Sequence, residues 1–324
     1  MSSEKSSIPE ISIVVPLFNE ESVFNILVTR LNEIINKCHY SIEVLMVDDG
    51  SQDQTPELMT NLAESDANYH CVFLSRNFGH QAAVSAGLEN CLATKAVMIM
   101  DADLQDPPEL IFEFNDKIDD GYDVVFAIRK NRKETLLKKL AYWSFYRFQK
   151  KITSTKMPLD SGDFSMLSRR VVDYINSMPE KSRFLRGMRA WVGFKQIGVE
   201  YERNARQAGE TKYSIQSLIK LATDGIFNFS DLPLKLITRL GLYTIVLSII
   251  YISIIIVKRI FYDNVPEGYT TIIVSLALFS GVQLISLGVI GEYLHRIYDQ
   301  TRQRPLYIID KKIRNKKKTK ATIG

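Results

Sequence analysis

The stretch Val97-Met-Ile-Met-Asp-Ala-Asp-Leu-Gln-Asp-Pro-Pro108 decides the fold. Its four apolar residues predict a buried strand of a parallel sheet, because both faces of the strand are hydrophobic. Such a strand places Asp101 and Asp103 in the crevice at the carboxyl edge of the sheet, where open α/β sheets bind ligands. Two carboxylates at this spacing can share a hard divalent cation that bridges to a diphosphate. A solvated acidic turn has the same spacing, so the neighbouring segments must decide.

Similar apolar runs recur along the chain and alternate with helical patterns. They predict strands at 11–18, 42–47, 70–74, 122–128 and near 199–204, with helices after the first three. This alternation is typical of a doubly wound α/β domain with a mostly parallel sheet. No Gly-x-Gly-x-x-Gly follows the first strand and no Gly-Lys-Ser/Thr loop is present, which argues against a dinucleotide dehydrogenase and a P-loop ATPase.

The second strand also ends in acid, at Asp48-Asp49-Gly50-Ser51. Either aspartate could accept a hydrogen bond from a base N–H or a ribose hydroxyl. A simple polar turn explains either residue alone equally well.

Two long uncharged runs, 240–257 and 269–291, predict a pair of transmembrane helices. Eighteen residues are near the lower limit for a span and 23 suffice with some tilt. The chain from Arg296 onward holds ten basic residues against two acidic ones, so the positive-inside rule places it in the cytoplasm. Two spans return the N-terminal part to the same side. The polar start is no signal peptide, and three scattered cysteines fit a reducing compartment.

Several segments near these runs are basic or amphipathic. Residues 135–152 combine cations and aromatic rings and predict a helix that lies on anionic lipid, although an ordinary packed helix or a nucleic-acid patch has the same composition. Asp160 and Asp163 follow in a glycine-containing turn under the same crevice. The loop 206–212 holds two cations near a glycine and could fold over phosphates. We expect the Lys-rich C-terminal residues to be disordered and attracted to lipid.

Five motifs in sequence resemble the family 2 glycosyltransferases with the GT-A fold. More narrowly they resemble the polyprenyl-phosphate glycosyltransferases, which include dolichol-phosphate mannose synthases and bacterial undecaprenyl-phosphate glucosyltransferases. The motifs are Val14-Val-Pro-Leu-Phe-Asn-Glu-Glu21, Val47-Asp-Asp-Gly-Ser-Gln-Asp-Gln-Thr55, Ser75-Arg-Asn-Phe-Gly79, Asp101-Ala-Asp-Leu-Gln-Asp-Pro-Pro108 and Arg206-Gln-Ala-Gly-Glu-Thr-Lys-Tyr-Ser214. Each motif is weak alone, but together they cover most of residues 10–235 in the family's order.

The resemblance implies roles for particular residues. Nucleotide-sugar binding would fall to Pro16, Phe18, Glu20, Val47, Asp49, Asp101, Ala102, Arg206 and Lys212. Asp101, Asp103 and Gln105 would hold Mg²⁺ or Mn²⁺ together with the diphosphate. Arg129 would join Arg206 and Lys212 in binding the phosphates of donor or acceptor. Asp160 is the candidate for orienting the acceptor or an arginine, with base catalysis as the alternative and a purely structural turn role equally open. The catalytic candidates are thus Asp103, Asp160 and Arg129.

We therefore predict four parts. Residues 1–213 form a cytoplasmic GT-A domain, 214–235 an interfacial helix, 236–295 the two-helix transmembrane hairpin and 296–324 a basic cytoplasmic tail. The implied reaction, in a bacterial inner membrane, transfers a sugar from a nucleotide donor to polyprenyl phosphate with inversion. Similarity to the bacterial branch favours glucose from UDP-glucose; GDP-mannose and an aminoarabinose donor stay open. Ala277 and Gly281 make a small-xxx-small pair in the second span, from which we expect a homo-oligomer.

Two rival functions remain at this point. A processive polysaccharide synthase usually carries a Gln-x-x-Arg-Trp motif and more spans, and neither is visible in the sequence. A membrane scaffold or flippase component with a degenerate nucleotide fold is the alternative outside the enzymes. The intact Asp101-Ala-Asp103 motif and the complete basic loop argue against it.

Overall fold

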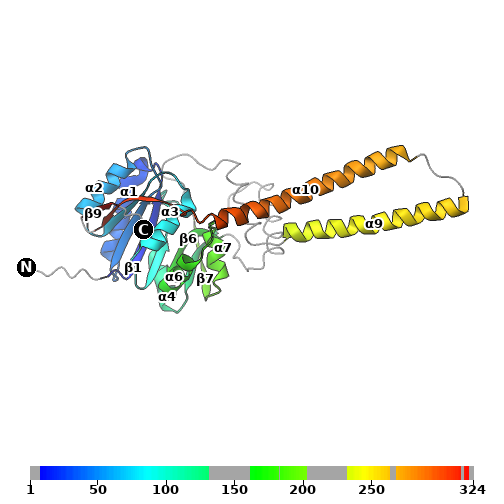
Figure 1. Ribbon diagram of the computed structural model, residues 1–324. Helices are drawn as coiled ribbons and strands as arrows, with labels where there is room; N and C mark the ends of the chain where they lie inside the picture. Colours follow the sequence, from blue (N-terminus) through cyan, green and yellow to red (C-terminus); the bar gives the residue numbers. More distant parts are fainter. Residues whose placement is uncertain are drawn as a thin grey trace, which may run out of the picture. The chain divides into compact units, whose positions relative to one another are not determined.

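A computed structural model describes residues 8–130, 161–181, 183–202, 232–262, 268–314 and 317–320. The chain divides into two compact units. The first contains strands β1 to β9 and their helices, and the second contains the long helices α9 and α10 (Figure 1). Nine strands of the described residues form one sheet in the order β7-β5-β6-β4-β1-β2-β3-β8-β9.

The elements of the first unit alternate along the chain as the apolar pattern predicts. They are β1 (Ile11–Leu17), α1 (Glu21–Lys37), β2 (Ile42–Asp48), α2 (Thr55–Ser65), β3 (Tyr69–Leu74), α3 (His80–Asn90), β4 (Ala96–Ile99), α4 (Leu110–Asp119), β5 (Val124–Lys130), β6 (Ser161–Ser168), α6 (Arg169–Ser177), α7 (Leu185–Trp191), β7 (Gln196–Glu202), β8 (Ile309–Arg314) and β9 (Lys317–Lys320). Strands β1 to β4 pair in parallel, so the prediction of a mostly parallel α/β sheet is confirmed.

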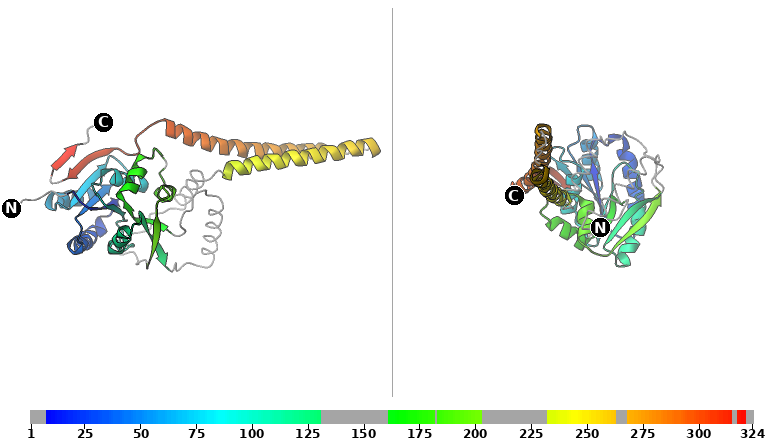
Figure 2. Two further views of the ribbon diagram at one scale, coloured as in Figure 1. Left: turned by 90° about the horizontal axis from the view of Figure 1, so that it is seen from below. Right: turned by 90° about the vertical axis from the view of Figure 1, so that its right-hand side faces the viewer.

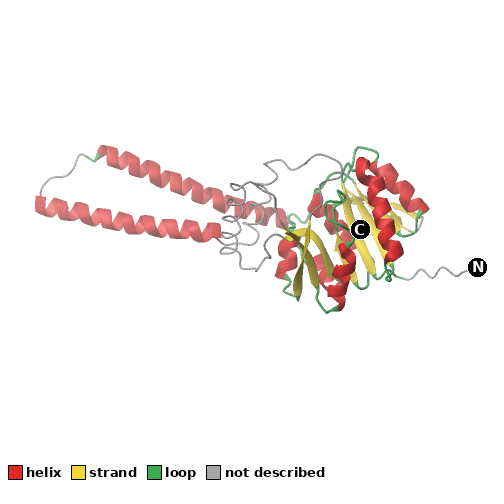
Figure 3. Ribbon diagram, turned by 180° about the vertical axis from the view of Figure 1, so that it is seen from behind, coloured by secondary structure: helices red, strands yellow, loops and turns green. Residues whose placement is uncertain are grey.

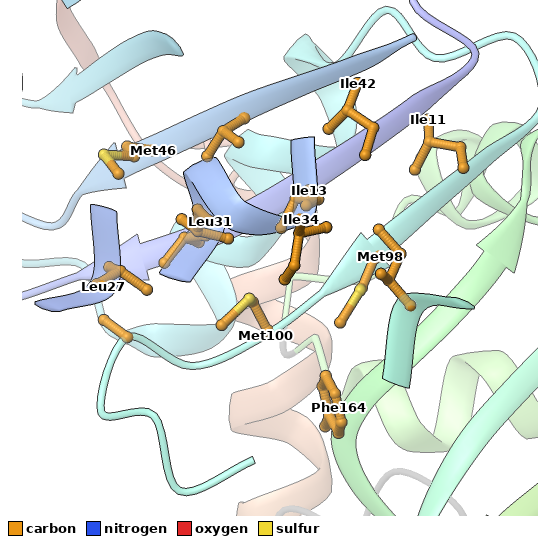
Figure 4. Packing of buried hydrophobic residues seen from close by; sticks show 14 of the residues in the cluster. Ile11, Ile13, Leu27, Leu31, Ile34, Ile42, Met46, Met98, Met100 and Phe164 are labelled. Carbon is orange, nitrogen blue, oxygen red and sulfur yellow. The ribbon is translucent and has the colours of Figure 1, made fainter. Parts of the chain in front are cut away.

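The central strands are apolar on both faces because each face is covered by helices. Successive side chains of a strand point to opposite sides. Ile11, Ile13 and Val15 therefore join one core cluster with α1, α2 and α4, whereas Val14 joins the other with α3, α6 and α7. Figure 4 shows the first cluster, in which Leu27, Leu31 and Ile34 of α1 lie over β1, β2 and β4. Figure 3 shows the helices beside the strands.

Strand β6 is absent from the sequence prediction, which reads its first residues as a turn. It pairs antiparallel with β4 and with β5, and Ile99 lies opposite Ser165. Because β6 is antiparallel to β4, it begins at the edge of the sheet where β4 ends. The start of β6 therefore lies at the same edge as the acidic motif.

The prediction that the C-terminal residues are disordered is wrong for β8 and β9. Strand β8 pairs antiparallel with β3, and β9 pairs with β8 (Figure 2). Ile313 is 1% exposed and belongs to the core, and the Lys311 ammonium lies 4.2 Å from the centre of the Phe73 ring. The backbone groups of β3 explain the difference, since a strand without a neighbour on one side presents unpaired N–H and C=O groups.

The second unit contains α9 (Leu232–Tyr262) and α10 (Tyr269–Thr301), which run in opposite directions as two arms of a hairpin (Figure 1). The uncharged runs 240–257 and 269–291 lie inside these helices. Judged on length and apolar character together, none of the helices among the described residues qualifies as a membrane span.

Candidate active site

The carboxyl edge of the sheet brings together segments that are far apart in sequence. Leu17 at the end of β1 lies opposite Asp48 of β2, and β4 runs parallel to β1 on its other side. The turns that follow β1, β2 and β4 are therefore neighbours at one edge. The start of β6 and the start of α3 join them.

Hydrogen bonds connect the turn after β1 with the turn after β2. The backbone N–H of Asn19 donates to Ser51 Oγ at 2.9 Å, and Asn19 Oδ1 accepts from the N–H of Gln52 at 2.8 Å. The N–H of Glu20 donates to Thr55 Oγ1 at 3.0 Å. Asn19 adopts a positive φ of 53°, which an asparagine tolerates better than most residues. These contacts fix the backbone of the predicted nucleoside site.

Asp49 is buried and anchors a third segment. Its Oδ1 accepts from the N–H of Phe78 at 2.7 Å, and its Oδ2 accepts from the N–H of Gly79 at 2.9 Å. Burial raises the pKa of Asp49, and these two hydrogen bonds oppose that rise. The structure thus gives Asp49 a definite task in holding the turn before α3, while its contact with a nucleoside stays a prediction.

Gly50 has no room for a side chain. Its φ is +72°, and an added Cβ would lie 2.5 Å from the carbonyl carbon of Arg76. We expect Gly50→Ala to lower the free energy of unfolding by at least about 2 kcal/mol, because left-handed strain adds to a backbone clash. Gly193→Ala is the matched control, since Gly193 has a φ of +73° but its Cβ would meet only Trp191 O at 3.8 Å. If urea unfolding gave the same decrease in the free energy of unfolding for Gly50→Ala and Gly193→Ala, the backbone clash at Gly50 would be refuted.

The acidic motif follows β4 directly. The Asp101 side chain is 40% exposed, and Asp103 Oδ1 accepts from the N–H of Gln105 at 3.1 Å. Buried Leu104 lies between Asp103 and Gln105 with a φ of 55°, a conformation that strains a branched residue. Partial burial raises the pKa of Asp101, and the nearby charges of Asp163, Asp106 and Asp103 add to the rise. A cation at this position would offset the cost of ionising Asp101.

A charged cluster adjoins Asp101. The Nε2 atom of His80 lies 3.6 Å from Asp101 Oδ1 and 3.7 Å from Asp163 Oδ2. Arg186 donates to Asp163 from Nε at 2.8 Å and from Nη2 at 3.2 Å, and Gln81 Nε2 donates to the same carboxylate at 3.2 Å. We call His80, Gln81, Asp101, Asp163 and Arg186 the edge cluster.

The edge cluster shifts the pKa values of its members. Burial alone lowers the pKa of His80, but the contact with Asp163 and the charges of Asp101 and Asp163 raise it to about 9. Burial alone raises the pKa of Asp163, but the charge of Arg186 and the contacts with His80 and Arg186 hold it well below its usual range. Asp163 therefore carries a negative charge and His80 a positive one at neutral pH.

Most of the site residues predicted from the sequence lie at this edge of the sheet, and some lie outside the described residues. Pro16 and Val47 are buried in β1 and β2, and Phe18, Glu20, Asp49, Asp101, Ala102, Asp103 and Gln105 lie in the turns at the same edge. Arg129 belongs to β5, opposite Tyr201 of β7. Asp160, Arg206 and Lys212 lie outside the described residues, as do the predicted helix 135–152 and the loop 206–212.

Sequence reasoning missed His80, Gln81 and Arg186. His80 and Gln81 follow the Ser75–Gly79 motif directly, and Arg186 belongs to a run of three arginines spaced three residues apart, Arg183, Arg186 and Arg189. Arg186 and Arg189 lie on α7, and this spacing of cations was the available signal. Arg189 is 3% exposed, and burial lowers its pKa to about 10.

Divalent metal binding at this edge agrees with the donor chemistry. Carboxylate oxygens are the ligands that Mg²⁺ and Mn²⁺ prefer. Burial raises the pKa of Asp101, and the charges of Asp163, Asp106 and Asp103 add to that rise. Among the described residues no group of three or more His, Cys, Asp or Glu side chains could hold a metal alone. Asp101 and Asp103 are the described carboxylates that would hold such a cation.

The α/β sheet with an acidic motif after β4 agrees with the GT-A fold that the sequence motifs predict, and the family comparison gives the class of the protein, a glycosyltransferase. Residues 12–175 match the family model described as glycosyl transferase family 2, and residues 232–297 match the GtrB C-terminal hairpin. The chain belongs to glycosyltransferase family 2.

Relatives match nearly the whole chain. An uncharacterized glycosyltransferase YkcC of Bacillus subtilis is 44% identical over 301 residues, covering 93% of each chain. The bactoprenol glucosyl transferase of Shigella phage SfX is 39% identical over 302 residues, covering 93% of this chain and 98% of its own. Among solved structures, glucosyl-3-phosphoglycerate synthase from Mycobacterium tuberculosis with Mn²⁺, UDP and glucosyl-3-phosphoglycerate is similar at a TM-score of 0.44 and 16% identity, covering 68% of this chain and 78% of its own.

Proposed function

We propose that this protein transfers glucose from UDP-glucose to polyprenyl phosphate and releases UDP. The observation that carries the proposal is the convergence of Asp101, Asp103 and the Asp48–Ser51 turn at one sheet edge, in a chain whose bactoprenol glucosyl transferase relatives match over nearly their whole length. A nucleotide-sugar donor fits an acidic edge only with a divalent cation, which we propose to be Mg²⁺ or Mn²⁺.

The acceptor determines which groups the reaction needs. A phosphate monoester has a second pKa near 6, so it arrives as an anion and needs no general base. The difficulty is electrostatic, because two anions must approach each other. Cationic side chains answer it, and we propose Arg129, Arg206 and Lys212 for phosphate contacts and Asp160 for orienting the acceptor or an arginine. A divalent cation bound by Asp101, Asp103 and Gln105 would neutralise charge on the leaving diphosphate.

A single displacement follows from this arrangement. An acceptor phosphate oxygen attacks the anomeric carbon, the bond to the UDP oxygen breaks, and the configuration inverts. The turns fixed by Asn19 and Asp49 would hold the nucleoside during this step.

We further propose that α9 and α10 form the membrane hairpin and keep the catalytic unit and both termini on the cytoplasmic side. Support comes from the uncharged runs 240–257 and 269–291, from the basic residues after Arg296, and from the match to the GtrB hairpin. Most of the large exposed apolar side chains among the described residues also lie on these two helices.

Cysteine labelling can test this topology. A single cysteine introduced at Tyr269, in a variant without the three native cysteines, should react with an impermeant maleimide from the periplasmic side. A cysteine at exposed Asp310 should react only after the membrane is opened. Equal labelling of both sites in intact cells would refute the hairpin topology.

The reaction is tested by a donor screen with the purified full chain. With polyprenyl phosphate and Mg²⁺ or Mn²⁺, label from UDP-glucose should enter a chloroform-soluble product, and EDTA should abolish the transfer. Transfer from GDP-mannose or an aminoarabinose donor alone would replace the assigned sugar. No lipid-linked label with any donor would refute the enzymatic function.

A further inference from the structure

His80 lies between two parts of the site that the motifs treat separately. It is the first residue of α3, and the two residues before it donate their backbone N–H groups to Asp49. Asp49 follows β2 on the proposed nucleoside side, whereas Asp101 follows β4 on the proposed metal side. The backbone before His80 is thus held by Asp49, and the His80 imidazole lies near the Asp101 carboxylate.

The far side of the imidazole is fixed as well. Asp163 lies 3.7 Å from His80 Nε2, and it cannot turn away easily because Arg186 holds both of its oxygens. Gln81 adds to this restraint, since Nε2 donates to Asp163 and Oε1 accepts from the N–H of Leu185 at 3.0 Å. His80 is therefore restrained through Asp49 on one side and through Asp163 on the other.

We propose that His80 is a positioning residue that holds the Asp101 carboxylate in the orientation that binds the divalent cation. The inference rests on the proposed metal-dependent function. The Nε2–Oδ1 separation of 3.6 Å is longer than a hydrogen bond, and such contacts commonly shorten when a site is loaded. Partners that orient a ligating carboxylate typically contribute 10- to 100-fold to metal affinity.

The affinity of the protein for Mn²⁺ tests this role of His80 without requiring sugar transfer. We would follow free Mn²⁺ by electron paramagnetic resonance with the full chain and UDP, without sugar donor or lipid. His80→Ala should raise the Kd for Mn²⁺ by about 10- to 100-fold. His80→Gln should recover part of the loss, because its amide nitrogen can donate at a similar reach.

The chain offers a matched control in His70. Its Nε2 lies 3.7 Å from Glu43 Oε2, so it makes the same kind of contact at nearly the same distance, away from the acidic motif. His70→Ala should leave the Kd for Mn²⁺ unchanged. An unchanged Kd in His80→Ala, an equal loss in His80→Ala and His80→Gln, or an equal loss in His70→Ala would overturn the proposal.

Two further outcomes are decisive. If His80→Ala does not fold, nuclear magnetic resonance of the wild-type protein replaces the variant measurement. The ring resonances of His80 should shift on addition of Mg²⁺ and UDP, while those of His70 stay in place. A His80 signal that does not move would overturn the proposal. If the wild-type protein binds no Mn²⁺ in the presence of UDP, the metal-dependent function and the role of His80 are both refuted. If the wild-type protein binds Mn²⁺ and the His80 variants bind it with the same Kd, only the role of His80 is refuted.

Discussion

Asp103→Ala is expected to lower sugar transfer by at least about 1,000-fold, which corresponds to about 4 kcal/mol of transition-state stabilisation. The physical reason is the loss of a carboxylate oxygen that, in the proposed mechanism, holds the cation against the leaving diphosphate. Asp103 lies in the turn directly after β4, where its Oδ1 also accepts the N–H of Gln105. Losing that hydrogen bond costs about 1 kcal/mol of folding stability, too little to explain the loss of activity.

Asp116→Ala is the control for this prediction, because Asp116 is an exposed acid on α4. Initial rates with UDP-glucose and polyprenyl phosphate should be unchanged in that variant. Thermal unfolding of both variants would show that the protein remains folded. Wild-type turnover in saturating EDTA, or full activity of Asp103→Ala, would contradict the metal role.

Ile313→Asp is expected to destabilise the catalytic unit by more than about 4 kcal/mol. Shortening a buried isoleucine to alanine already costs about 2 to 5 kcal/mol, and an unpaired buried carboxylate adds to that. Ile313 is 1% exposed in β8, opposite Cys71 of β3. The neighbouring Arg314 donates to the buried Glu43 at 3.0 Å, so detachment of β8 would also remove the partner of that carboxylate.

The same segment supplies a matched control. Ile308 is 53% exposed, so Ile308→Asp should change the free energy of unfolding by less than about 1 kcal/mol. Urea unfolding of the full chain in detergent, followed by tryptophan fluorescence, would compare the two variants. Equal stability of Ile313→Asp and Ile308→Asp would show that β8 contributes nothing to the fold of the catalytic unit.

The site was predictable from the sequence where it depends on the end of a strand. Acids that follow the apolar strand β4 must emerge at the carboxyl edge, and parallel pairing of β4 and β2 with β1 puts them at the same edge as the turn after β2. The position of Asp101 and Asp103 at the same sheet edge as Asp48–Ser51 was therefore inferred correctly. The task of Asp49 in binding the Phe78 and Gly79 backbone was not, because that partner lies 29 residues away.

Sequence alone determined the parallel α/β core, because a strand buried on both faces must be apolar at most of its positions, and that requirement is local. Only the tertiary structure decided β6, β8 and the edge cluster. Residues 309–314 are rich in cations and give no strand signal of their own; they form a strand because β3 presents unpaired backbone groups and the core accepts Ile313. The contact of His80 with Asp101 and Asp163 likewise exists only once three separate elements have met at one edge.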